Sequence, residues 1–256
     1  MIHPQSIIET GAQIGKNVTI GPWTYIGKDV VIGDNCEINS HVVIKGPTRV
    51  GKGNRFFQFA SIGEECQDLK YDGEPTELVI GDNNTFREGC TMHRGTIQDN
   101  SLTQIGSDNL FMAYSHVAHD CIVGNHCIMA NNASIAGHVQ LGDYVIIGGM
   151  SAVHQFCHIG SHSFIAANAL VLKDVPAFVM ASGHPAKPFG LNSEGLRRRG
   201  FDNVTIANIK RAYKQVYRKG LNVGEAIESV KLLAEQSPEV NTFTDSVINS
   251  SRGIIR

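Results

Sequence analysis

The chain has 256 residues, of which 18% are charged and 42% hydrophobic, and its formal net charge is −2 at pH 7. This length suits one or two domains, and the small net charge gives no overall sign of nucleic-acid binding. No apolar run is long enough to span a membrane, and no signal peptide is visible before a repeated pattern that begins at residue 2.

Large apolar residues recur at every sixth position through most of the chain. The series runs from Ile2 to Ile62, resumes over residues 80–92, and continues one residue out of phase from Ile105 to Val171. Periods of 3.6 and 2 do not produce a step of six, whereas short strands separated by corners do. Three such sides close one coil of 18 residues. Stacked coils then form a parallel β-helix of about nine turns, roughly 4.8 Å apart.

Two other positions of the repeat have a consistent composition. The second position is often glycine, as at Gly21 and Gly33, and we attribute these glycines to corners that need unusual dihedral angles. The fifth position is small or β-branched and faces inward. Five of the six cysteines occupy it, which is typical of reduced core residues in a cytoplasmic protein. Cys66 lies outside the repeat.

Two segments interrupt the repeat, residues 64–78 and residues 93–104. Long excursions from a regular scaffold are usually functional loops, although tolerated surface insertions produce the same pattern. The residues alone leave both explanations open.

After Pro176 the pattern changes to a Pro- and Gly-rich connector and then to helical spacing. Capping residues and one apolar face predict a helix from Asp202 or Asn203 to Gly220. Two more helices are expected around residues 223–235 and 239–249. We therefore expect a β-helix domain over residues 1–185 and an α-helical domain over residues 186–256.

Basic residues gather in this tail. Residues 197–219 contain eight basic residues and one acidic residue, a local net charge of +7 that leaves −9 for the rest of the chain. A solvated helix face is the usual explanation for a charge run. An anionic partner or a phosphate group is the alternative, whereas nucleic acid has no interleaved aromatic residues to support it.

Several of the 11 histidines fall together when residues 18 apart are stacked on adjacent coils. Asp120 then lies under His138, with His119 and His154 within two residues of that column and His116 one side away. The pattern predicts a site that crosses three coils along one edge of the prism.

Such a cluster has two chemical interpretations. One is a zinc site, but the γ-class carbonic anhydrases, which use the same prism, place two zinc histidines five residues apart, and no two histidines here have that spacing. The other is general base catalysis by His119, with a carboxylate that fixes its tautomer. No serine or cysteine nucleophile is evident, because Cys121 is an inward position, and direct acyl transfer is the more natural mechanism.

Six stretches carry a more specific signal: QDLKYDGEPTELVIGD, TMHRGT, SHVAHDCIVGN, ASIAGHV, IIGGMSAVHQF and GLNSEGLRRRGF. Together they resemble the UDP-N-acetylglucosamine O-acyltransferases of lipid A biosynthesis, and the match covers essentially the whole chain. Because hexapeptide-repeat proteins are left-handed, the resemblance implies a left-handed parallel β-helix. It also implies transfer of a 3-hydroxyacyl chain from acyl carrier protein to the 3-hydroxyl of UDP-N-acetylglucosamine, the first step of lipid A biosynthesis.

The resemblance assigns roles to single residues. His119 matches the general base, Asp120 the supporting carboxylate, and the backbone N–H of Gly137 the oxyanion donor. The residues that match substrate contacts are His116, His138 and His154 near the sugar and acyl group, Gln155, Asn192, Glu194, Arg198 and Arg199 at the nucleotide and diphosphate, and Gln67, Asp68, Lys70 and His93 in the two excursions. These matches favour a functional role for the excursions.

The resemblance also implies partners. The family's active sites lie between the subunits of a homotrimer, and acyl carrier protein brings the acyl group as a phosphopantetheine thioester, so we expect no separate cofactor and no metal. Carrier docking is assigned collectively to Lys210, Arg211, Lys214 and Arg218. Ala167 falls where the family closes its acyl groove, and its small side chain predicts a fairly long acyl chain.

Two other functions compete with this one. The related N-acyltransferase acts on a UDP-amino sugar but carries a different N-terminal domain, whereas here the repeat begins at residue 2. A β-helix that only binds or scaffolds would have no reason to gather His119, Asp120 and His138 on one edge beside two arginines.

Overall fold

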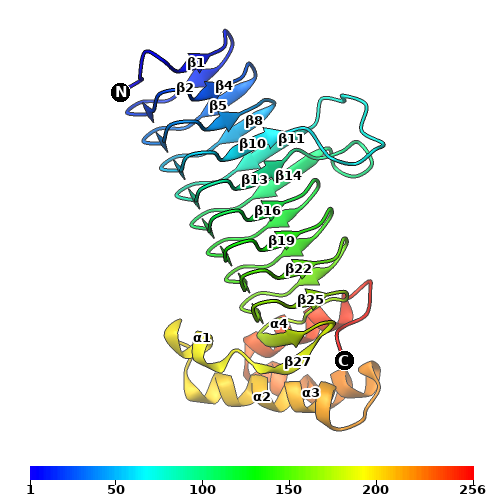
Figure 1. The fold of residues 1–256 in the computed structure, drawn as a ribbon. Helices are drawn as coiled ribbons and strands as arrows, with labels where there is room; N and C mark the ends of the chain where they lie inside the picture. Colours follow the sequence, from blue (N-terminus) through cyan, green and yellow to red (C-terminus); the bar gives the residue numbers. More distant parts are fainter.

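The structure is a computed structural model that describes the backbone of residues 1–256 and every side chain except that of Gln236. Stacked coils form a long prism, with the N-terminus at one end and a layer of helices across the other (Figure 1). Within the described residues the strands form three sheets, and all pairing between coils is parallel. This arrangement confirms the parallel β-helix that the six-residue repeat predicts.

Each regular coil contributes one short strand to each sheet. Sheet I contains β1 (Ile7–Ile8), β4 (Tyr25–Ile26), β7 (Val43–Ile44), β10 (Ser61–Glu64), β13 (Thr91–His93), β16 (His116–Val117), β19 (Ser134–Ile135), β22 (Ala152–Val153) and β25 (Leu170–Val171). Sheet II contains β2 (Gln13–Ile14), β5 (Val30–Ile32), β8 (Thr48–Val50), β11 (Glu77–Ile80), β14 (Leu102–Ile105), β17 (Ile122–Val123), β20 (Gln140–Leu141) and β23 (His158–Ile159). Sheet III contains β3 (Thr19–Ile20), β6 (Glu37–Ile38), β9 (Arg55–Phe56), β12 (Thr85–Phe86), β15 (Leu110–Phe111), β18 (Ile128–Met129), β21 (Ile146–Ile147), β24 (Phe164–Ile165), β26 (Val179–Gly183) and β27 (Ala186–Leu191).

The large residues of the repeat fill the inside of the prism, as predicted. Phe56, Phe86 and Phe111 stack in one buried column, with ring centroids 4.8 and 4.9 Å apart and ring planes within 4° of parallel. The first coil is the exception, because Ile2 is 49% exposed and Ile8 and Ile14 are only partly buried. The first coil has a neighbour on one side only, so its inward residues are not fully covered.

Crowding between coils explains the glycines at the second position of the repeat. A Cβ on Gly33 would lie 2.6 Å from the backbone of Gly51 in the next coil, and a Cβ on Gly21 would lie 2.6 Å from the backbone nitrogen of Ser40. Neither glycine has a positive φ; the corners instead place non-glycine residues such as Asn35 there, at a φ of 61°. Our explanation from unusual dihedral angles is therefore wrong for Gly21 and Gly33, where close backbone approach excludes any side chain.

The two predicted interruptions are loops that project from one side of the prism (Figure 1). The first joins β10 to β11 and the second joins β13 to β14. In a regular coil, paired residues of neighbouring strands are 18 positions apart in the sequence. The first loop increases this separation to 30 positions between Phe56 and Phe86, and the second increases it to 25 positions between Phe86 and Phe111. The second loop therefore adds seven residues instead of a multiple of six, which explains the change of phase.

The C-terminal region starts with a β-hairpin in place of the expected connector. β26 continues sheet III in parallel with β24, β27 returns antiparallel to β26, and the expected boundary at residue 185 falls in the turn between them. The described chain then forms α1 (Ser193–Arg198), α2 (Asn203–Arg218), α3 (Val223–Gln236) and α4 (Pro238–Ile248). The last three confirm the predicted helices, and the Asp202 side chain caps α2 by accepting from Thr205 N–H at 2.8 Å. Across the described residues, no helix has the length and apolar character needed to cross a membrane.

Gly33→Ala tests the crowding between coils. The added methyl group would overlap the backbone of Gly51, so we expect the free energy of unfolding to fall by about 1–3 kcal/mol. Gly27→Ala is the matched control, because Gly27 occupies the same position of the repeat but its Cβ would stand 3.5 Å from the nearest atoms. Thermal and urea unfolding measure the difference, and equal stability of the two variants would contradict the explanation.

Candidate active site

A cavity lined by histidines lies on the outer side of sheet I. It has a volume of about 400 Å³, and its walls come from the coils that carry β13, β16, β19 and β22 and from the first excursion. Seven of the predicted site residues line it: Gln67, Asp68, His93, His116, His119, Gly137 and Gln155. The fold thus gathers residues that are up to 88 positions apart in the chain.

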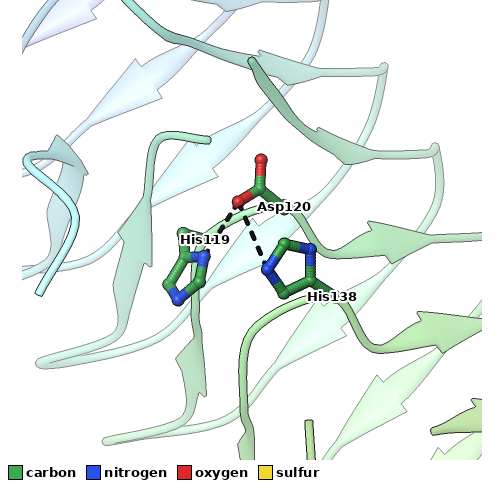
Figure 2. A group of neighbouring side chains, drawn as sticks. All are labelled: His119, Asp120 and His138. Atoms are coloured by element: carbon green, nitrogen blue, oxygen red, sulfur yellow. Dashed lines mark hydrogen bonds and ion pairs between the residues drawn. The ribbon is translucent and has the colours of Figure 1, made fainter. Parts of the chain in front are cut away.

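His119 and Asp120 form a hydrogen-bonded pair at the wall of this cavity. The Nδ1 atom of His119 lies 2.8 Å from the Oδ2 atom of Asp120 (Figure 2). The side chain of Asp120 is only 1% exposed and that of His119 is 15% exposed. Because an ionised carboxylate can only accept, Nδ1 is the donor, and Nε2 of the neutral imidazole is left as a proton acceptor.

Thr96, in the second excursion, holds Asp120 from the other side. Its backbone N–H donates to Oδ1 of Asp120 at 2.8 Å, and its hydroxyl donates to Oδ2 at 2.6 Å. Burial alone would raise the pKa of the Asp120 carboxyl, but the hydrogen bonds from His119 and Thr96 outweigh burial and lower this pKa below its ordinary value. Asp120 is therefore ionised at neutral pH and would stabilise a positive charge on His119.

His138 lies one coil beyond Asp120, as the 18-residue stacking predicts. Its Nε2 atom is 3.8 Å from Oδ2 of Asp120, and its ring meets the ring of His119 edge-on with centroids 5.1 Å apart (Figure 2). Asp120 and His138 occupy equivalent corners of the prism, with φ values of 57° and 61°. The repeated corner geometry therefore brings the two side chains together.

Gly137 is packed directly against His119. A Cβ at Gly137 would lie 2.5 Å from Cε1 and 2.6 Å from Nε2 of the His119 ring. Its carbonyl accepts from Phe156 N–H at 3.1 Å, whereas its own N–H has no hydrogen-bond acceptor among the described residues. A glycine here lets the ring of His119 lie over the backbone and leaves one N–H donor beside it.

His93 and His116 form a second pair of histidines in the cavity. Their rings meet edge-on with centroids 5.0 Å apart, and Nδ1 of His116 lies 2.7 Å from the hydroxyl of Thr91. Burial lowers the pKa of His93 to about 4, with a further contribution from His116, and burial followed by the influence of His119 lowers the pKa of His116. Both rings are neutral at pH 7 and offer hydrogen bonds to a ligand without adding charge.

Of the predicted site residues up to Ala167, five do not line this cavity: Asp120 and His138, described above, and His154, Lys70 and Ala167. His154 follows β22 and is exposed, and its Nδ1 atom lies 3.2 Å from the carbonyl of Gln155. Lys70 is exposed in the first excursion. Ala167 is exposed in the corner between β24 and β25.

A second cavity, of about 270 Å³, lies over sheet III. The four predicted nucleotide residues Asn192, Glu194, Arg198 and Arg199 line it, together with Ile146, Phe164 and Met180 on β21, β24 and β26. Within one chain, this group and the histidine cavity belong to different faces of the prism. One copy of the chain therefore does not bring all the predicted site residues together.

The two arginines of the second cavity differ in their surroundings. Arg199 is partly buried, lies over the ring of Tyr144 with 5.2 Å to the centroid, and donates from Nη2 to the carbonyl of Tyr144 at 3.1 Å. Its Nη1 atom is buried and has no hydrogen-bond partner in the described part of the chain. Arg198 is 78% exposed and pairs with Glu194 at 3.2 Å. Asn192 caps α1 and also donates to the carbonyl of His162 at 3.0 Å.

The basic residues of α2 separate into two groups. Lys210, Lys214 and Arg218, spaced four residues apart, line a cavity of about 300 Å³ with residues of β27. Arg211 points elsewhere and donates to the side chain of Asn208 at 2.8 Å. The four predicted docking residues thus lie on one helix but not on one face.

Thr96 and Arg94 are among the residues that hold the excursions in place, and the sequence alone did not reveal either role. Thr96 lies within the TMHRGT stretch, so its signal was present, but nothing in the spacing pointed to Asp120 as its partner. Arg94 is buried and connects the two excursions by donating to the hydroxyl of Tyr71 at 2.9 Å and to the carbonyl of Gly46.

His119, Asp120 and His138 each offer a donor atom, and these atoms lie within 4.8 Å of one another, close enough to hold a metal ion. The carboxylate of Asp120, however, already accepts three hydrogen bonds, from His119 and twice from Thr96. This arrangement favours a carboxylate that supports a histidine base through a hydrogen bond over a carboxylate that binds a metal ion.

Two family models match the chain. One, described as UDP N-acetylglucosamine O-acyltransferase domain 2, matches residues 174–255, and the other, the bacterial transferase hexapeptide of six repeats, matches residues 11–46 and 102–137.

Several relatives match over the full length of the chain. The acyl-(acyl-carrier-protein)–UDP-N-acetylglucosamine O-acyltransferase of Stutzerimonas stutzeri is 53% identical over 256 residues, which is 100% of this chain and 99% of the relative. The solved structure of LpxA from Acinetobacter baumannii has a TM-score of 0.98 at 53% identity, covering 100% of this chain and 99% of the other. The Arabidopsis UDP-N-acetylglucosamine acyltransferase has a TM-score of 0.88 at 35% identity and full coverage of both chains. Because this similarity extends over the entire length, the chain belongs to the UDP-N-acetylglucosamine O-acyltransferase family.

Proposed function

We propose that this protein transfers a 3-hydroxyacyl chain from acyl carrier protein to the 3-hydroxyl of UDP-N-acetylglucosamine, the first step of lipid A biosynthesis. The relative from Stutzerimonas stutzeri, 53% identical over the whole chain, is named for this donor and this acceptor. The observation that carries the mechanism is the cavity in which Nε2 of His119 is free while Asp120 holds Nδ1 at 2.8 Å.

In the proposed reaction His119 is the general base. Its Nε2 takes the proton of the sugar hydroxyl while the sugar oxygen attacks the thioester carbonyl, and the resulting imidazolium is stabilised by the ionised Asp120. When the tetrahedral intermediate collapses, the carbon–sulfur bond breaks and the carrier thiol leaves with the proton that His119 held. The products are the 3-O-acyl sugar nucleotide and the free carrier thiol, and no acyl-enzyme forms.

Gly137 supplies the oxyanion donor in this proposal. Its N–H has no acceptor among the described residues and lies next to the His119 ring, so it is available to the developing negative charge on the carbonyl oxygen. Fixed donors of this kind contribute about 3–4 kcal/mol to acyl-transfer transition states. His116, His138, His154 and Gln155 would orient the sugar and the acyl chain around these groups.

We further propose that the active unit is a homotrimer whose sites lie between subunits. The histidine cavity lies over sheet I, whereas Asn192, Glu194, Arg198 and Arg199 surround a cavity over sheet III. These groups can serve one substrate if sheet I of one copy faces sheet III of its neighbour, which lets the arginines bind the diphosphate. Gln67, Asp68, Lys70 and His93 would bind the sugar nucleotide from the excursions.

The acyl donor, in this proposal, docks at the basic tail and brings its phosphopantetheine thioester, so that no separate cofactor takes part. Lys210, Lys214 and Arg218 share one cavity, and Arg211 on the same helix adds to the positive field that an acidic carrier protein would meet. We assign the reaction to the cytoplasm, because all six cysteines are free and buried, as in proteins of reducing compartments.

His119→Ala tests the base. We expect kcat to fall by about 10²–10⁴-fold, because general bases contribute that much, while the oligomer stays intact. His126→Ala is a matched control, since His126 is a corner histidine outside the cavity lining. Product formation from UDP-N-acetylglucosamine and 3-hydroxyacyl carrier protein is followed by mass spectrometry. Near-normal turnover of His119→Ala would remove His119 as the base.

Mixed oligomers test the inter-subunit site. His119→Ala and Arg198→Ala should each be nearly inactive alone, but co-expression should restore about a quarter of wild-type activity if each site combines the two residues from neighbouring subunits in random trimers. Sites contained within one chain would give no recovery. Size-exclusion chromatography with light scattering checks that the mixed oligomers form.

A donor panel tests the role of Ala167. The wild type should prefer a fairly long 3-hydroxyacyl chain, Ala167→Gly should accept a longer one, and Ala167→Met a shorter one, because the side chain would close the end of the groove. Competition between carrier proteins with different acyl chains, read by mass spectrometry, measures the preference. A clear wild-type preference for short chains would contradict the assignment.

A further inference from the structure

The ring of His138 has four neighbours in the protein, namely Phe156, His119, Asp120 and Asp99. Its face stacks on Phe156, with centroids 4.3 Å apart and planes 8° from parallel, and its edge meets His119. Its Nε2 atom is directed at Asp120, 3.8 Å away. The remaining nitrogen, Nδ1, lies 3.0 Å from the Oδ2 atom of Asp99. The pattern of matched family residues does not include Asp99.

Asp99 reaches the site from the second excursion and not from a coil of the prism. It lies between Thr96 and β14, in the segment that leaves sheet I after β13, and it is 39 residues away from His138 in the sequence. Its side chain is 39% exposed, whereas that of His138 is 12% exposed. The same short loop therefore makes two separate attachments to the site, Thr96 to Asp120 and Asp99 to His138.

The contact fixes which nitrogen of His138 carries a proton. A carboxylate only accepts, so Nδ1 of His138 must donate to Asp99, as Nδ1 of His119 must donate to Asp120. Without this bond the stacking on Phe156 would still define the plane of the ring, but a 180° flip about the Cβ–Cγ bond would keep that plane while exchanging Nδ1 with Cδ2 and Nε2 with Cε1. Of the contacts to His138, Asp99 is thus the one that determines the direction of Nε2.

We propose that Asp99 is a positioning residue of the active site, which orients His138 through Nδ1 so that its Nε2 edge faces Asp120 and the catalytic His119. The second excursion then orients two side chains of the site. It aligns the Asp120 carboxylate through Thr96 and the His138 ring through Asp99. The consequence for turnover rests on the proposed function, whereas the orientation of His138 does not.

The test compares Asp99→Ala, Asp99→Asn and Gln98→Ala. Asp99→Ala removes the acceptor. Asp99→Asn keeps a side-chain oxygen that can accept from Nδ1. Gln98→Ala truncates the neighbouring exposed residue and makes no change to His138. Gln98→Ala therefore controls for any general loosening of the loop.

The first readout is kinetic, with UDP-N-acetylglucosamine and a 3-hydroxyacyl carrier protein as substrates. Asp99→Ala should lower kcat about threefold to tenfold, the range expected for a partly exposed hydrogen bond to a charged group. Its KM for the sugar nucleotide should stay within about twofold of wild type, since Asp99 is not expected to contact that substrate. Asp99→Asn should recover most of the kcat, and Gln98→Ala should behave as wild type.

The second readout is the imidazole N–H resonance of His138 in protein labelled with ¹⁵N-histidine, assigned with His138→Gln. The Nδ1 proton should be protected from exchange in wild type and Asp99→Asn and lost in Asp99→Ala. An unchanged resonance and unchanged kcat in Asp99→Ala would overturn the proposal, and so would an equal loss of kcat in Gln98→Ala. If the wild type transfers no acyl group while the resonance still depends on Asp99, the proposed function fails and the positioning of His138 stands.

Discussion

The hydrogen bonds between successive coils are the constraint on which the structure depends. Each coil donates backbone N–H groups to carbonyls of the next, as Gly27 N–H does to the carbonyl of Ile44 at 2.8 Å and Ile128 N–H does to that of Val145 at 2.9 Å. A bond in the opposite direction, from the later coil to the earlier one, joins His138 N–H to the carbonyl of His119 at 3.0 Å. The spacing that holds the prism together thus also sets the spacing of His119 and His138. Side chains are excluded where the backbones approach most closely, at glycines such as Gly33.

The candidate site adds irregular elements to this regular frame. Asp120, His138 and Phe156 occupy successive corners of one column, with φ values of 57°, 61° and 64°, so the frame stacks their side chains without further help. The frame does not by itself orient those side chains. The second excursion does so through Thr96, whose two hydrogen bonds, together with the one from His119, outweigh burial and keep Asp120 ionised. The stacked coils thus place the side chains, and the loop orients them. An acyl-transfer site needs both, because the reacting groups must be close together and correctly aligned.

The histidine column was predictable because it follows from arithmetic on the repeat. Residues 18 apart must stack, so the sequence alone pairs Asp120 with His138. The helices α2, α3 and α4 were predictable from capping residues and apolar spacing, which are local signals. The excursions were recognisable as interruptions, but their contacts were not. Arg94, Thr96 and Asp99 carry no period, and their partners lie 23 to 48 residues away.

The explanation of the glycines was wrong for a related reason. A single sequence shows that Gly21 recurs with the repeat, but it does not distinguish a need for positive φ from a lack of space. Both exclude a Cβ, and only the position of the neighbouring coil separates them. The same limit applies to Arg198 and Arg199, adjacent in the sequence, of which one is exposed and the other lies over Tyr144.

The sequence by itself determined the parallel β-helix, the places where it is interrupted, the helical tail and the edge on which the histidines gather. It could do so because a strict six-residue period allows only one way to bury the large residues. The same period makes each residue stack on the residue 18 positions away. Only the tertiary structure decided how the loops return to the prism, which carboxylate holds which imidazole nitrogen, and that the arginines lie on a different face from the histidines. Those features depend on contacts between segments with no common period, and their geometry exists only once the coils are stacked.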